Sequence, residues 1–226
     1  RLARDKDDQL LEDPRFQFIS DEKGTIRDIR VPRGAKFVAG ERIGTLNPMN
    51  HVHLIAGRSG SEMNALAALS LPNVTDAIAP VIEQVELFTD DWSSIETGRP
   101  ESRIKLSGRI RIVVRAFDRM DGNPERRKLG VYRLGYEIFH VDGSAVSDLK
   151  WTIEFDRMPP NEAVSLAYAN GSQSGYTGET FFDYIVTNRL TKDKIGEEFL
   201  DTATLQPGSY TIRVFAADLF GNNTTK

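Results

Sequence analysis

Short stretches in which apolar and polar residues alternate, separated by turn-forming residues, dominate this sequence. The clearest examples are residues 109–115 and 210–215, where every second side chain is apolar. Successive side chains of a strand point to opposite faces of a sheet, so a period of two predicts strands with one buried face. Helix-forming composition is confined to residues 62–69 and 161–169. The sequence therefore predicts a mainly β fold.

A connector at residues 72–80 divides the sequence into two regions with different strand lengths. Before it, short strands at 16–19, 25–31 and 41–46 and the helix at 62–69 predict a compact antiparallel β domain over residues 1–71. After it, residues 81–226 contain longer strands and no βαβ crossover, which predicts an immunoglobulin-like β-sandwich. The six strongest strand candidates there are residues 81–88, 104–117, 130–141, 151–155, 181–187 and 209–216.

Charge and composition exclude several classes of protein. The 29 Lys and Arg residues are interspersed with 33 Asp and Glu residues, which argues against a nucleic-acid or anionic-membrane binder. The absence of cysteine excludes disulfide scaffolds, thiol catalysis and Cys-ligated zinc. No apolar run approaches the length of a transmembrane helix, so we expect no membrane-spanning segment.

Two of the three histidines, His51 and His53, lie two residues apart in a predicted strand. Side chains at this spacing point to the same face, so both imidazoles converge on one spot. A pair of imidazoles on a strand suits part of a zinc site, although catalytic zinc usually takes three protein ligands. An ordinary surface pair is the alternative. The third histidine, His140, lies at the end of a predicted sandwich strand, where we expect a structural or exposed residue.

The residues before this histidine pair form an ordered glycine pattern. The positions that define the whole pattern are Gly34, Gly40, Ile43, Gly44, His51 and His53. This pattern resembles the closing part of the peptidase M23 (lysostaphin-like) domain, where a glycine-punctuated stretch precedes a His-x-His strand. The resemblance covers about residues 15–60 and only the second half of the family domain.

The resemblance implies a zinc metallopeptidase that hydrolyses amide bonds of peptidoglycan or of a protein. His53 would be a zinc ligand, and His51 would act beside the metal-bound water as general base or stabiliser of the tetrahedral intermediate. It also implies a periplasmic, cell-surface or secreted location. The sandwich would be an accessory domain whose partner the sequence does not name.

The family's other two zinc ligands, a His and an Asp, come from a motif upstream of the matched part. No His precedes His51, and we interpret Asp5, Asp7 and Asp8 as a solvated acidic loop. The start at Arg1 favours an amino-terminal half outside this sequence, so residues 1–226 alone should be inactive. The alternative is a non-catalytic envelope or extracellular binding protein with a degenerate M23 fold. A third interpretation is a β adhesion-type protein in which the His-x-His match is accidental.

A faint repeat marks two predicted strand ends. Asp118 and Asp218 each follow an alternating strand and each precede a Gly-Asn pair, Gly122-Asn123 and Gly221-Asn222. We interpret these aspartates as turn residues that bond the following backbone. Calcium binding by such Asp/Asn tips is the alternative. Trp92 is interpreted as a core or edge aromatic, with a glycan-stacking surface as the alternative.

Overall fold

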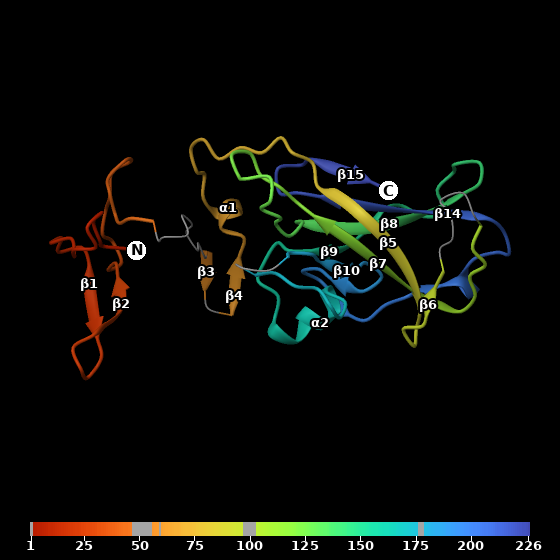
Figure 1. Cartoon of the computed structure of the whole chain (residues 1–226), viewed down its shortest axis with the longest axis horizontal. Coiled ribbons are helices and arrows are strands. Elements are labelled where there is room, and N and C mark those ends of the chain that lie inside the picture. The colour runs from red at the N-terminus through yellow and green to blue at the C-terminus, as the bar shows by residue number, and fades with distance from the viewer. Residues whose placement is uncertain (1, 47–55, 59, 97–102, 176–178) are drawn as a thin grey trace. The chain divides into compact units, whose positions relative to one another are not determined.

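The computed structural model describes residues 2–46, 56–58, 60–96, 103–175 and 179–226 (Figure 1). These residues belong to two compact units, Arg1–Leu54 and Ile55–Lys226. Strands account for 38% of the structure and helices for 7%, which confirms the mainly β prediction. His51 and His53 lie outside the described residues.

The first unit is built on a β-hairpin. Strands β1 (Gln17–Ser20) and β2 (Ile26–Arg30) pair antiparallel, as predicted. The predicted strand at residues 41–46 is wrong, since only Gly44 takes part in an isolated bridge, to Leu2. The reason is local, because the Glu41 carboxylate accepts a hydrogen bond from the Val38 backbone N–H and bends this segment into a turn.

The second unit begins with a small hairpin and a single helical turn. Its elements are β3 (Ala56–Arg58), β4 (Ser61–Met63) and α1 (Ala65–Ala68). The helix is shorter than predicted because Asn64 caps it and the preceding residues belong to β4. The Asn64 N–H donates to the Asp156 carbonyl, and the Met158 N–H donates to the Glu62 carbonyl. The structure therefore groups residues 55–80 with the sandwich and divides the chain before the predicted 72–80 connector.

Two sheets form the body of the second unit (Figure 1). The first sheet has the order β10-β7-β5-β6, with β13 also paired to β7. Its strands are β5 (Val81–Thr89), β6 (Ser94–Ile95), β7 (Arg109–Phe117), β10 (Asp183–Ile185) and β13 (Leu200–Asp201). All pairings in this sheet are antiparallel.

The second sheet has the order β12-β11-β9-β8-β14-β15. Its strands are β8 (Arg133–His140), β9 (Lys150–Glu154), β11 (Arg189–Leu190), β12 (Ile195–Gly196), β14 (Tyr210–Ala217) and β15 (Asn223–Thr225). Only the β9–β11 contact is parallel. Each of the six strands predicted for residues 81–226 overlaps a strand of the structure.

The hydrophobic core lies between the two sheets. Ile112 and Val114 of β7 are fully buried, as are Leu134 of β8 and Ile153 of β9. The strand period of two places the intervening β7 residue Val113 on the opposite face of the first sheet. Three short helical segments, η1 (Asn161–Ala163), α2 (Val164–Ala167) and η2 (Thr202–Thr204), complete the unit. In the part of the chain that the structure covers, no helix is long and apolar enough to cross a membrane.

Candidate functional site

The glycine pattern that led to the histidine pair has a conformational basis in the first unit. Gly34 has φ +93° and Gly40 has φ +84°, in the left-handed region that favours glycine. Each glycine lies in a turn, closed by hydrogen bonds from Ala35 to Pro32 and from Glu41 to Val38. The glycine spacing therefore encodes two consecutive turns ahead of residues 47–55.

The acidic residues of the first unit are engaged in local contacts. The Asp5 carboxylate accepts hydrogen bonds from the backbone N–H groups of Asp7 and Gln9, so it organises its own loop as expected. The Arg15 guanidinium binds the Asp13 and Glu41 carboxylates. Hydrogen bonding from Arg15 lowers the pKa of Asp13 to about 2. The carboxylates of Asp5, Asp13 and Glu41 therefore stabilise local turns and bind Arg15.

His140, the remaining histidine, lies at the exposed end of β8. Its ring centroid is 5.4 Å from that of Tyr210 on the neighbouring strand β14. This placement agrees with the expected structural or exposed role.

A cluster of three carboxylates lies in the second unit, where strands of both sheets end. Asp76 precedes β5, Asp118 follows β7 and Asp218 follows β14. One oxygen from each residue lies within 4.8 Å of the others. Asp118 and Asp218 are buried, and Asp76 is half-buried. Because β5 runs antiparallel to β7, the start of one strand and the end of the other meet at this edge.

The two aspartates of the sequence repeat make different hydrogen bonds. Asp218 is a turn residue as predicted, since its carboxylate accepts hydrogen bonds from the backbone and side-chain nitrogens of Asn222, at 2.8 and 2.7 Å. The Asn222 amide also donates to the backbone carbonyl of Asp76, at 3.0 Å. Asp118 has no such partner in Asn123, whose N–H donates to the Met120 carbonyl. Its Oδ1 is buried and has no hydrogen-bond partner.

The environment of Asp118 disfavours its charged form. Burial raises its pKa to about 7, against a hydrogen bond from the Arg119 backbone, and the nearby Asp218 and Asp76 raise it further. None of the ion pairs among the described residues involves these three carboxylates. Asp76 was missed in the sequence because it is a lone acid in the 72–80 connector. Only the pairing of β5 with β7 brings it to the repeat.

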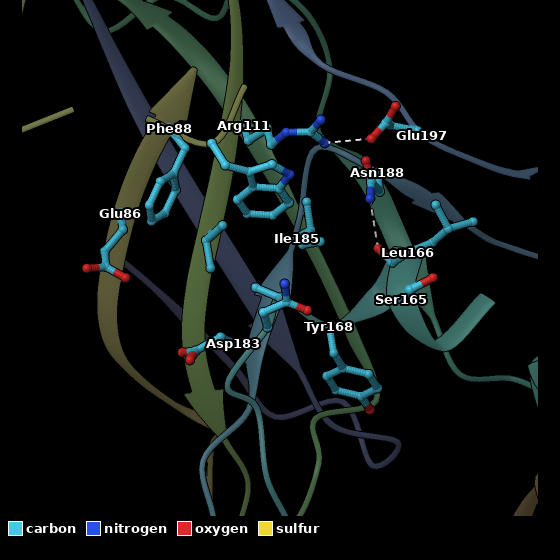
Figure 2. Close-up of a pocket in the computed structure, with 14 residues that line it drawn as sticks. Glu86, Phe88, Arg111, Ser165, Leu166, Tyr168, Asp183, Ile185, Asn188 and Glu197 are labelled. Carbon is cyan, nitrogen blue, oxygen red and sulfur yellow. Dashed lines mark hydrogen bonds and ion pairs between the residues drawn. The ribbon is translucent and has the colours of Figure 1, made fainter. Parts of the chain in front are cut away.

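A groove of about 420 Å³ lies on the face of the first sheet opposite the core (Figure 2). We refer to it as the sheet groove. Its lining residues are Glu86, Phe88, Trp92, Arg111, Val113, Ser165, Leu166, Tyr168, Ala169, Asn170, Asp183, Ile185, Asn188 and Glu197. Figure 2 shows Arg111 and Glu197 at one end and Asp183 and Tyr168 at the other.

Several polar side chains of the sheet groove are hydrogen-bonded within the fold. Arg111 donates to Glu197 at 2.8 Å, and the Asn188 amide donates to the Leu166 carbonyl at 2.9 Å (Figure 2). Asp183 accepts two hydrogen bonds from Arg115, both at 2.8 Å. No histidine lines the groove, and its serine, Ser165, bonds a backbone carbonyl.

Trp92 stands at the rim of this groove in an unusual backbone conformation. Its φ is +66°, which bulky residues rarely adopt, and its side chain is 44% exposed. Hydrogen bonds among Thr89, Asp91 and Ser93 hold the turn. The Ser93 N–H donates to the Thr89 hydroxyl and to the Asp91 carboxylate, and the Thr89 hydroxyl donates to the same carboxylate. The Arg111 guanidinium lies 4.6 Å from the Trp92 ring centroid. Trp92 lies in the turn between β5 and the edge strand β6, so it is an accessible aromatic residue at the sheet edge, in line with the edge role predicted for it.

Comparisons of this chain with protein-family models, with curated proteins and with solved structures found no match.

Proposed function

We propose that residues 1–54 form the closing part of an M23-type zinc metallopeptidase and that the sandwich is its accessory domain. The observation that carries this proposal is the ordered glycine pattern that leads to His51-Val52-His53. Its support is that Gly34 and Gly40 both have positive φ, so the pattern has a backbone requirement as well as a spacing. The strand order of the two sheets supports an immunoglobulin-like sandwich.

The donor set for zinc is incomplete in this sequence. His51 and His53 are donors of the right type, but a catalytic zinc site takes three protein ligands and keeps an open position. The described carboxylates of Asp5, Asp13 and Glu41 are bonded to backbone N–H groups or to Arg15. When bound, zinc would polarise the scissile carbonyl and activate a water molecule. The proposal requires further ligands beyond residues 1–226, so we derive no reaction step from these residues.

Zinc content tests this proposal directly. The protein isolated from its native source, without added metal, should contain about one zinc per chain by elemental analysis, in line with a single catalytic site. His53→Ala should abolish zinc retention and peptidoglycan hydrolysis, and His51→Ala should mainly lower turnover. His140→Ala is the matched control and should leave both unchanged. Absence of zinc from the intact, folded protein would contradict the peptidase and favour the non-catalytic alternative.

The sheet groove favours a second function, binding of a wall glycan by the sandwich. Glycan rings stack on exposed aromatic faces, and Trp92 offers such a face beside the polar side chains of Asn170 and Asn188. This function stands whether or not the zinc site is complete, since it uses residues of the second unit alone. Localisation outside the cytoplasm belongs to this proposal as well.

Tryptophan substitutions test glycan binding. The chain has two tryptophans, and calorimetric titration with soluble muropeptides measures the affinity whichever of them is replaced. Trp92→Ala should weaken muropeptide binding about 10-fold, the size of one lost aromatic contact. Trp151 lies on the second sheet under Arg133 and is the matched control. Equal affinities of Trp92→Ala and the unmodified protein would contradict a role for the groove.

A further inference from the structure

We propose that Asp76, Asp118 and Asp218 form a calcium site that joins the residue 72–80 segment to both sheets of the sandwich. This inference is independent of the peptidase and glycan proposals, because it uses none of their residues. Calcium binding is the alternative role that the sequence leaves open for Asp118 and Asp218. The structure adds Asp76 as a third carboxylate beside them.

The negative charge of the three carboxylates is uncompensated among the described residues. Three carboxylates lie together, two of them buried, and no cationic side chain among the described residues pairs with them. The nearest basic residue in sequence, Arg119, directs its guanidinium to Glu125 and to the Phe117 ring. Like charges brought together in a buried place destabilise the fold unless a proton or a cation compensates them.

The Asp118 carboxylate has one oxygen without a hydrogen-bond partner. Asp118 is 7% exposed, and its Oδ1 has no hydrogen-bond partner although nearly all buried polar atoms in proteins have one. The other members of the cluster are held in place, because the Asn222 amide donates to Asp218 and to the Asp76 carbonyl. The Ile78 N–H donates to the Asp76 carboxylate at 3.0 Å. A buried carboxylate oxygen that has no hydrogen-bond partner, next to two aspartates that are held in place, points to a ligand.

The geometry and chemistry of the donors favour calcium. Calcium binds oxygen at about 2.3–2.6 Å, so two of its ligands lie at most about 4.6–5.2 Å apart. The three carboxylate oxygens lie within 4.8 Å of one another and meet this limit. The cluster contains neither histidine nor cysteine, the ligands that zinc and copper prefer. Calcium takes 6–8 oxygens, and waters or carbonyl groups at this exposed end of the sheets would supply the rest.

The position of the cluster gives the site a structural consequence. Asp118 follows a strand of the first sheet, Asp218 follows a strand of the second, and Asp76 belongs to the segment that enters β5. A bound cation would fasten all three segments, whereas the Asn222 amide bridges only the segments of Asp76 and Asp218. We therefore expect calcium to stabilise the second unit and to order the segment that enters it.

Thermal unfolding of the full chain, with added calcium chloride or with a chelator at pH 8, tests this site. At a calcium concentration 100 times the Kd, the equilibrium constant for unfolding should fall about 100-fold. Affinities of about 0.1–1 mM are typical of extracellular calcium modules, so about 10 mM calcium is about 10–100 times the Kd and should lower this constant about 10- to 100-fold. Both tryptophans lie in the second unit, so their fluorescence reports its unfolding. Calorimetric titration of the unmodified protein with calcium gives the stoichiometry, expected to be one.

Substitution of Asp118 distinguishes a metal ligand from a residue that only stabilises a turn. Asp118→Asn removes one negative charge from the cluster. In chelator, the melting temperature of this variant should therefore be higher than that of the unmodified protein. Added calcium should not raise it further. A purely structural role predicts a lower melting temperature in both conditions. Asp142→Asn is the matched control, because Asp142 also caps a turn, at Ser144, but lies outside the cluster. It should lose stability equally with and without calcium.

Three results would overturn the proposal. The first is an unmodified protein that neither binds nor is stabilised by about 10 mM calcium. The second is an Asp118→Asn protein that keeps the full calcium response. The third is an equal response to magnesium and calcium, which would contradict the assignment of the ion. If Asp118→Asn does not fold, Asp76→Asn replaces it, since Asp76 is only half-buried.

Discussion

The second unit buries a continuous set of apolar side chains between two sheets, whereas only Ala3 and Phe16 are buried apolar residues among the described part of the first unit. The first unit is held instead by a hairpin, glycine turns and the contacts of Arg15 with Asp13, Glu41 and the Phe37 ring. Exposed ion pairs contribute little to stability, whereas buried apolar surface contributes most of it. The two units should therefore respond differently to equivalent substitutions.

The largest expected effect is the removal of a core side chain from the second unit. Ile112→Ala should reduce the free energy of unfolding by about 2–5 kcal/mol, because the side chain is fully buried and its loss leaves a cavity. Urea denaturation followed by tryptophan fluorescence measures it. Ile43→Ala, at a 47% exposed position of the first unit, is the control and should leave this transition unchanged. Equal effects would contradict the contrast between the units.

A second effect concerns pH and Asp118, a buried carboxylate with a raised pKa. Asp118 has a pKa of about 7 in the folded protein, above its ordinary 3.8, so the folded state holds its proton more tightly than the unfolded state. Without calcium, stability should therefore fall as pH rises from about 4 to about 7, by on the order of 2–4 kcal/mol. Melting temperatures across this range measure it. Asp118→Asn should flatten the profile, and an unchanged profile would contradict the shift.

A smaller effect compares one glycine turn in each unit. Gly24 has φ +77° in the β1–β2 hairpin and Gly143 has φ +85° in a sandwich turn, and a Cβ at either would meet open space. Alanine should therefore cost each turn about 1 kcal/mol of backbone strain. Gly143→Ala should lower the stability of the second unit by that amount and leave it folded. Gly24→Ala should visibly speed amide exchange in β1 and β2, because little else holds them. Unchanged exchange there would show that the first unit has stability beyond its turns.

The smallest effect lies in the exposed ion cluster of the first unit. Arg15→Ala should raise the pKa of Asp13 from about 2 toward its ordinary range, because the side-chain hydrogen bond from Arg15 is the largest cause of the shift, while the hydrogen bond from the backbone N–H of residue 15 remains. Since a lowered pKa stabilises only above the unfolded value, the contribution of Asp13 to stability is lost as pH falls from about 4 to 2. Carboxyl titration by NMR measures it, with Asp21, whose pKa is lowered by other partners, as the unaffected reference.

Much of the fold could be predicted from the sequence, since strand periodicity is a local property. The alternation at residues 109–115 and 210–215 became β7 and β14. The prediction failed at residues 41–46, where the composition suits a strand but the segment pairs only at Gly44. The helix at 62–69 was overestimated, because pairing in the β3–β4 hairpin took its first residues. The first failure came from a turn at residues 38–41 and the second from a neighbouring hairpin, and composition does not encode either contact.

Several residues of the candidate sites could be found in the sequence, but their roles could not. Asp118 and Asp218 were visible as a repeat, and Trp92 as an aromatic residue, but their roles depended on neighbours far away in the chain. Asp76 joins the cluster only because β5 pairs with β7, and Arg111 reaches Trp92 only across the first sheet. The residues His51 and His53 lie outside the described part, so their zinc role stays a prediction.

The sequence alone determined the strands, the turns and the glycine pattern, because backbone preference and apolar period act over a few residues. Tertiary structure decided which side chains meet. It placed three carboxylates at one end of two sheets, left the Asp118 Oδ1 without a partner and set Trp92 beside a groove. Packing of the two sheets brings together Asp76 and Asp218, which are 142 positions apart in the chain, and electrostatic interactions depend on the distance in space rather than along the chain.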